Sequence, residues 1–207
     1  MIAIIDYGVG NLFSLQSSFA AVGQDAAVTR DPEEIRRADR LILPGVGAFR
    51  DAAEKLRNSG MEAVVKDEAA RGKPLLGICL GMQMLFERSY EYGVHKGLGL
   101  LKGEIRPIAE RIPEGLKIPQ MGWNALKIVR ESPLLKYTRA GEYVYFVHSY
   151  SAVDCGESLL AVTEYGADLT ACVGYGNVFG CQFHPEKSGE TGLRILKAFC
   201  ETEDATA

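Results

Sequence analysis

A cysteine between two glycines is the residue whose surroundings most clearly indicate chemistry. Residues 77–81 have the pattern G-x-C-x-G, follow the apolar pair Leu75-Leu76 and precede a stretch with helical spacing. This is the sulfur form of the sharp strand-to-helix turn that raises a nucleophile above the edge of a sheet. Glycines flank such a turn because it crowds the backbone and leaves no room for Cβ atoms. We therefore predict that Cys79 is a nucleophile, since the start of the following helix favours its thiolate.

An imidazole and a carboxylate follow more than a hundred residues later, in His184-Pro185-Glu186. A thiol nucleophile uses these two groups as its base and as the group that orients the base. The motif comes directly after the strand-like run 178–182, and the ends of strands are where an α/β sheet places its ligands. A strand-like i, i+2 spacing puts both side chains on one side. We predict that His184 is the base and that Glu186 holds its tautomer.

Acyl transfer also needs backbone donors for the oxyanion. The turn at Cys79 supplies the N–H of Leu80. A second N–H is expected from the loop Pro44-Gly45-Val46-Gly47, where two glycines in four residues let a peptide plane turn toward the substrate. We predict that this donor belongs to Val46 or Gly47.

Other residues of reactive type have a simpler interpretation. A cysteine inside a short pattern can be structural, and only the combination with the histidine motif and the glycine-rich loop disfavours that reading for Cys79. The remaining cysteines are expected to be buried structural residues. His95 is given no role, and Trp123 is as well explained by the core as by function. Three histidines and scattered cysteines without C-x-x-C spacing predict no metal site.

Composition limits the class of protein. The chain has 207 residues, 47% of them apolar, and a net charge of -4 without a basic run, which disfavours nucleic acid as the main partner. No apolar stretch approaches the length of a membrane span. The N-terminus is expected to be a first strand and not a signal peptide. Unpaired cysteines then favour a reducing cytoplasm.

Strand and helix signals alternate in the first half of the chain. Asp31 is expected to cap a helix that begins at Pro32, with Glu34 as the acid of a capping box. The alternation predicts an α/β fold of three layers with a mostly parallel central sheet, and the strands after residue 92 predict an antiparallel extension. Residues 1–200 are expected to form one domain and residues 201–207 a frayed polar tail. Strands are expected at 2–5, 26–29, 40–43, 75–78, 123–129, 143–147, 158–163 and 178–182, and helices at 12–22, from 32, and at 49–58, 61–71, 80–88 and 189–200.

These motifs resemble those of a known family. P-x-x-G-I-C-L-G-M-Q and F-H-P-E are similar to the nucleophile and base motifs of class I glutamine amidotransferases, whose core is flavodoxin-like. The resemblance covers nearly the whole chain. The segments at 6–11, 44–47, 121–124, 145–150 and 184–188 together resemble the glutaminase subunits of imidazole glycerol phosphate synthase.

The resemblance implies an activity, a partner and further site residues. Glutamine would be hydrolysed through a glutamyl thioester on Cys79, without a cofactor. Ammonia would pass to a separate (β/α)₈ cyclase subunit, in a heterodimer that makes imidazole glycerol phosphate and AICAR in histidine biosynthesis. The family's glutamine contacts match Gly47, Gln83, His148, Ser149 and Tyr150, and its partner-facing and ammonia-path positions match Asn11, Trp123, Asn124, Tyr145 and Lys187.

Two alternatives stay open. One is another class I amidotransferase, such as a pyridoxal-phosphate-pathway glutaminase, against which the segments 44–47 and 121–124 speak. The other is a catalytically inactive binding module of the same fold, which the intact Cys79, His184 and Glu186 disfavour. The segment 93–103 has no predicted role.

Overall fold

A nine-stranded sheet forms the centre of the fold. The computed structural model describes residues 1–202. The strands of the sheet lie in the order β2-β1-β3-β4-β13-β12-β11-β8-β9. The first five are parallel and the last four are antiparallel to their neighbours, so β13 joins the two halves. The parallel strands are β2 (Ala26–Thr29), β1 (Ile2–Ile5), β3 (Arg40–Leu43), β4 (Leu75–Ile78) and β13 (Val178–Cys181), and the antiparallel ones are β12 (Asp168–Tyr175), β11 (Leu159–Glu164), β8 (Gln120–Ile128) and β9 (Tyr143–His148).

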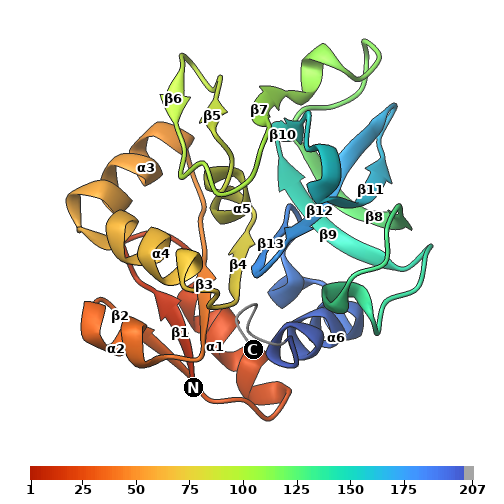
Figure 1. The fold of residues 1–207 in the computed structure, drawn as a ribbon. Helices are drawn as coiled ribbons and strands as arrows, with labels where there is room; N and C mark the ends of the chain where they lie inside the picture. Colours follow the sequence, from red (N-terminus) through yellow and green to blue (C-terminus); the bar gives the residue numbers. More distant parts are fainter. Residues whose placement is uncertain (203–207) are drawn as a thin grey trace.

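Helices cover both faces of this sheet (Figure 1). One face packs against α2 (Pro32–Arg37), α3 (Phe49–Asn58) and α4 (Met61–Ala70), and the other against α1 (Leu12–Ala21) and α6 (Gly189–Cys200). Successive side chains of a strand point to opposite faces, so Ala3 and Ile5 enter the first core while Ile2 and Ile4 enter the second. The predicted α/β class with three layers is confirmed.

A second, four-stranded sheet lies beside the first and was not predicted. Its order is β10-β7-β5-β6, with β10 at Tyr150–Val153, β7 at Glu104–Pro107, β5 at Arg88–Ser89 and β6 at His95–Lys96. It stands at the top of Figure 1, above α5 (Leu80–Met84). Short 3₁₀ helices at Ile108–Glu110, Pro133–Leu135, Gly156–Ser158 and Pro185–Lys187 complete the described elements.

The helix after Cys79 is shorter than the predicted 80–88, because α5 ends at Met84. Carbonyl groups that would continue the helix instead accept bonds from a later segment. The N–H of Leu98 donates to the Met84 carbonyl at 2.8 Å and that of Gly99 to the Phe86 carbonyl at 3.1 Å. A Cβ at Gly97 would lie 2.1 Å from the Phe86 oxygen, so only glycine permits this approach. The segment 93–103 therefore ends the helix that carries the nucleophile.

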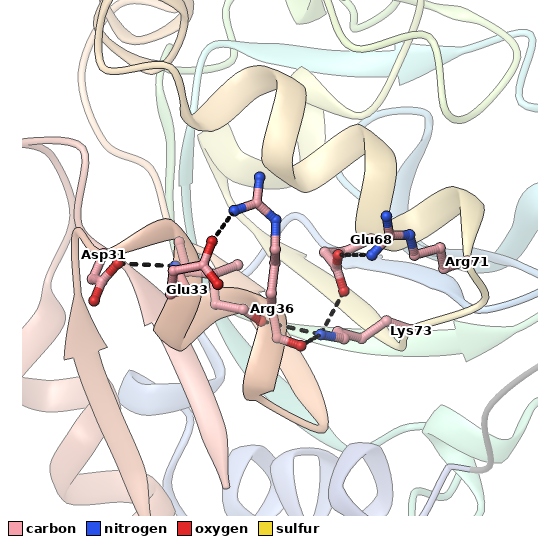
Figure 2. Close-up of polar contacts among 7 residues, drawn as sticks. Asp31, Glu33, Arg36, Glu68, Arg71 and Lys73 are labelled. Carbon is pink, nitrogen blue, oxygen red and sulfur yellow. Dashed lines mark hydrogen bonds and ion pairs between the residues drawn. The ribbon is translucent and has the colours of Figure 1, made fainter.

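The predicted cap of α2 is partly right. The Asp31 carboxylate accepts from the Glu33 N–H at 2.9 Å, as an N-cap should (Figure 2). The capping box with Glu34 is wrong, because the Asp31 N–H donates to Thr29 Oγ1 at 3.0 Å. The preceding strand thus supplies the acceptor that Glu34 was expected to supply.

A buried ion pair joins α4 to α2 (Figure 2). The Glu68 carboxylate is 3% exposed and lies 2.6 Å from Lys73 Nζ and 3.0 Å from a guanidinium nitrogen of Arg71. The same ammonium donates to the carbonyls of Ile35 and Arg36 at 3.1 and 2.7 Å. Lys73 thereby satisfies backbone acceptors at the end of α2 and neutralises a carboxylate on α4.

The chain end contradicts part of the predicted frayed tail. Thr202 is buried, its carbonyl accepts from Arg40, and the Glu201 carboxylate lies 2.6 Å from Lys136 Nζ. Residues 203–207 of that prediction lie outside the described part. Within residues 1–202, no helix has the length and apolarity that crossing a membrane requires.

Candidate active site

Three neighbouring parallel strands end at one edge of the sheet, and each is followed by a predicted site residue. β3 leads into the loop 44–47, β4 leads into Cys79, and β13 leads toward His184. Because β4 lies between β3 and β13 in the sheet, their carboxyl ends meet. The sheet order thus brings together residues that are more than a hundred positions apart.

Cys79 adopts the strained backbone of a nucleophile turn. Its φ of 54° and ψ of -112° are rare for a residue with a side chain, and its N–H donates to the Cys181 carbonyl at 2.7 Å. A Cβ at Gly77 would lie 2.7 Å from the Gly81 oxygen, and one at Gly81 would lie 1.8 Å from the Leu43 oxygen. Both glycines are required by close backbone contact, as the sequence predicts.

His184 and Glu186 form a buried pair beside Cys79. The imidazole Nδ1 donates to Glu186 Oε1 at 2.8 Å, and the two side chains are 3% and 1% exposed. This bond leaves Nε2 for the thiol. Burial lowers the pKa of His184, but hydrogen bonds with Cys79 and Glu186 outweigh it and raise the pKa to about 9. The three side chains have the arrangement of a nucleophile, a base and an orienting acid.

A buried glutamine that the sequence analysis missed also contacts the thiol. Gln182 Nε2 lies 3.8 Å from Cys79 Sγ, and its Oε1 accepts from Gln83 Nε2 at 3.0 Å. Gln83 in turn donates to the Tyr150 carbonyl at 3.1 Å. Gln182 stands two residues before His184 on the same strand run, and this spacing was the signal that could have identified it.

A cavity of about 550 Å³ opens over Cys79, within the usual size of small-molecule sites. All residues predicted to supply oxyanion donors or to contact glutamine line this cavity, and their roles stay predictions. Glu186 lies behind His184 and does not line it. The predicted residues that line the cavity are Val46, Gly47, Cys79, Leu80, Gln83, His148, Ser149, Tyr150 and His184.

Glu91 and Tyr92 also line this cavity and were missed. Glu91 Oε2 accepts from the Phe49 N–H at 2.7 Å, and the Tyr92 ring lies edge-on to that of Tyr150 at 6.4 Å between centroids. Tyr92 has a φ of 52°. The only signal in the sequence is an acidic residue shortly before Gly93, where the segment 93–103 without a predicted role begins.

His148 forms the cavity wall as a buried ring. Nδ1 lies 2.7 Å from the Tyr150 carbonyl, and Nε2 lies 2.9 Å from the Gln120 side chain. Burial is the largest influence and lowers the pKa of His148 to about 4, with a smaller contribution from His184. The ring is therefore neutral at pH 7 and carries its one N–H on Nδ1, where it donates to the Tyr150 carbonyl.

The predicted partner-facing residues divide into a cluster and two separate positions. Trp123 is 52% exposed, which excludes the core interpretation, and its ring lies 6.1 Å from that of Tyr145. Lys187 Nζ lies 5.9 Å from the Tyr145 ring. Asn124 accepts from Gln120 at 3.0 Å, and Asn11 stands at the start of α1 without a side-chain cap bond. Whether these residues meet a partner stays a prediction.

The described residues offer no group of three or more His, Cys, Asp or Glu side chains that is arranged to hold a metal ion. Their cysteines are all free.

Comparison with known proteins agrees with this geometry. Residues 3–202 match the model of the family described as glutamine amidotransferase class-I. The chain is 52% identical over 201 residues to the imidazole glycerol phosphate synthase subunit HisH of Lactococcus lactis subsp. lactis, covering 97% of this chain and 98% of that protein. It is also 52% identical over 202 residues to the subunit of the same name from Caldanaerobacter subterraneus subsp. tengcongensis, covering 97% of this chain and 98% of that protein.

Solved structures of lower identity share the fold. A crystal structure described as glutamine amidotransferase has a TM-score of 0.75 at 21% identity and covers 97% of this chain and 100% of that one. PurLQS from Thermotoga maritima has a TM-score of 0.73 at 21% identity, covering 96% of each chain. With a family match along nearly its whole length and relatives at half identity, the chain belongs to the class I glutamine amidotransferases and, among them, to the HisH subunits of imidazole glycerol phosphate synthase.

Proposed function

We propose that this chain hydrolyses glutamine to glutamate and ammonia as the glutaminase subunit of an imidazole glycerol phosphate synthase. The observation that carries the proposal is the Cys79–His184–Glu186 arrangement at the base of a 550 Å³ cavity, in a chain half identical to HisH subunits. Neither a metal nor a cofactor is required for this hydrolysis.

The thiolate of Cys79 attacks the side-chain carboxamide carbon of glutamine. The oxyanion that forms is stabilised by the N–H of Leu80 and by a second N–H from Val46 or Gly47. His184 transfers a proton to the leaving nitrogen, so that ammonia departs and a glutamyl thioester remains. His184 then takes a proton from water, which attacks the thioester and releases glutamate and the thiol. Glu186 keeps Nδ1 protonated throughout, so Nε2 exchanges the proton.

The cavity wall supplies groups for the amino-acid end of glutamine. Gln83, His148, Ser149 and Tyr150 lie along it, as the family resemblance predicts. The Glu91 carboxylate has no cationic side chain paired with it within residues 1–202 and faces the same cavity. We assign to Glu91 the binding of the α-ammonium group, because an unpaired carboxylate is the complement of that charge.

The exposed cluster of aromatic residues on β8 and β9 supports a partner surface. Met121 and Tyr143 are 63% and 59% exposed beside Trp123, and all lie on one pair of strands. Apolar and aromatic side chains gathered at a surface are typical of protein interfaces. The proposed partner is the (β/α)₈ cyclase subunit, which receives the ammonia within a cytoplasmic heterodimer, and residues 1–200 act as one domain.

Ammonia release from glutamine, measured with and without a cyclase subunit, tests the proposal. The Cys79→Ala variant should lose glutamine hydrolysis but still bind the cyclase and allow the complex to use free ammonia. An active glutaminase that ignores the cyclase would favour another class I amidotransferase. Absence of turnover in every condition would favour an inactive binding module.

A further inference from the structure

The loop that is proposed to carry the second oxyanion donor is fixed firmly at its first end. The Tyr7 hydroxyl donates to the Pro44 carbonyl at 2.6 Å, and the Tyr7 side chain is buried. A Cβ at Gly45 would lie 2.6 Å from the Gly81 nitrogen, so the loop packs directly on the nucleophile turn. These two contacts leave little freedom to residues 44 and 45.

Val46 and Gly47, in the second half of the loop, are less constrained by contacts. Val46 is 42% exposed, and Gly47 has a φ of 92° with no atom within 4 Å of a Cβ position. Neither N–H has a hydrogen-bond partner within residues 1–202. The two candidate donors are therefore unpaired, and their direction depends on where the second end of the loop is held.

A carboxylate from another part of the chain holds that second end. Helix α3 begins at Phe49, and its N-cap residue, Ala48, has no side chain that could cap it. Glu91, 42 positions away, accepts the Phe49 N–H on Oε2 at 2.7 Å. Capping normally comes from the N-cap residue itself, so this bond ties the loop to the cavity wall.

The other carboxylate oxygen of Glu91 is unpaired within residues 1–202. Within the described residues, Oε1 makes no hydrogen bond and no ion pair, while Glu91 lines the same cavity as Cys79. One oxygen of this carboxylate thus accepts a backbone donor at the end of the loop, and the other is unpaired within residues 1–202 in a side chain that lines the glutamine site.

We propose that Glu91 is a positioning residue that couples occupancy of the glutamine site to the placement of the oxyanion loop. The proposal rests on the glutaminase function proposed above. A cation bound to Oε1 restricts rotation of the carboxylate, which steadies the bond from Oε2 to Phe49 and with it the second end of the loop. Substrate that lacks the α-ammonium would reach Cys79 without this effect.

Steady-state kinetics of the complex with cyclase separate the two functions of the carboxylate. Glu91→Gln removes the charge but keeps an acceptor for Phe49, so KM for glutamine should rise while kcat stays within about twofold of wild type. Glu91→Ala removes both, so kcat should fall by about tenfold or more, because a misplaced oxyanion donor acts in the transition state. Asp31→Ala is the matched control: it removes the side-chain cap of α2 and should change neither constant.

Hydrogen exchange at the Phe49 amide tests the coupling without turnover. In the Cys79→Ala variant, saturating glutamine should slow exchange at Phe49, whereas glutaramate, which lacks the α-ammonium, should not. Adding Glu91→Ala should make exchange fast and insensitive to either compound, and Glu91→Gln should leave it slow but unresponsive.

Equal kcat values for Glu91→Gln and Glu91→Ala would overturn the proposal, as would equal protection of Phe49 by glutamine and glutaramate. Both results can be obtained while the wild-type complex hydrolyses glutamine normally, so they would leave the glutaminase function standing. A wild-type complex that releases no ammonia would instead refute the function itself.

Discussion

Cys79 differs from the other four cysteines in its surroundings as well as in its position. Burial raises the pKa of Cys155 and of Cys200 to about 11, and that of Cys181 well above its usual range. Cys79 instead stands at a helix start beside His184, in an open cavity. We expect a glutamine-like electrophile to label Cys79 at least about tenfold faster than the others. Peptide mapping after brief exposure measures this, and dominant label at any other cysteine would contradict the assignment.

The buried ring of His148 predicts a loss of stability in acid. Its folded pKa of about 4 lies below its unfolded value, so between about pH 6.5 and 4 the unfolded chain binds a proton that the folded chain does not. The free energy of unfolding should fall by about 3 kcal/mol over this window because of His148 alone. Urea unfolding of wild type and His148→Asn at several pH values isolates the effect. If the free energy of unfolding falls equally with pH in both proteins, His148 does not cause the loss.

His184 contributes to the pH dependence of stability in the opposite direction. Its folded pKa of about 9 is raised, so its contribution to stability is fully present below pH 6.5 and is lost as the pH rises through 9. In the same experiment, His184→Gln should flatten the alkaline side of the stability curve and leave the acid side unchanged.

At the scale of elements, the polar link between α2 and α4 depends on a single ammonium group. Lys73→Met would leave the 3%-exposed Glu68 carboxylate with only the exposed Arg71 as a partner. Breaking a buried pair in this way costs about 3 kcal/mol or more. Denaturant unfolding should show this loss, and Glu68→Met in the same chain should restore most of it. Lys102→Met, at an exposed position, is the control and should have little effect.

The sequence predicted those elements whose signals are local. The strands around the parallel half and the helices from Phe49 and Met61 follow from apolar spacing and glycine boundaries. The end of α5 did not follow, because its carbonyls bond to residues 97–101 and no local pattern encodes that choice. The second sheet was missed for the same reason, since β7 pairs with the distant strand β10 and with β5. β12 was missed although it forms local hairpins with β11 and β13.

The site residues also divide into those that local spacing predicts and those that it does not. Cys79, His184 and Glu186 were identified because short spacings specify their geometry. Glu91 gains its position from a tertiary contact with Phe49, which a single sequence does not display, whereas Gln182, bonded to Gln83, could have been found only from its spacing to His184. The exposure of Trp123 likewise depends on β8 and β9 lying at the edge of the large sheet.

At the scale of the whole molecule, activity should depend on the partner. Gly47 permits the end of the loop 44–47 more than one peptide orientation, and the loop's two candidate donors are unpaired within residues 1–202. We predict that binding of cyclase and nucleotide raises kcat with little change in the KM for glutamine, because the missing donor matters most in the transition state. Moving the competent state from about 1% to 99% requires about 5.5 kcal/mol of differential binding. A lone chain at full rate, or activation seen only in KM, would contradict this loop switch.

The place of β13 between the two halves of the large sheet has a consequence for biosynthesis. Translation delivers the nucleophile turn about a hundred residues before β13 and the base that follows it. Until β13 inserts beside β4, a nascent polypeptide on the ribosome holds a thiol without its base. Such high-contact-order pairing is slow compared with local helix formation. A chain in which β13 has not yet paired with β4 therefore lacks the base of the site and cannot hydrolyse cellular glutamine.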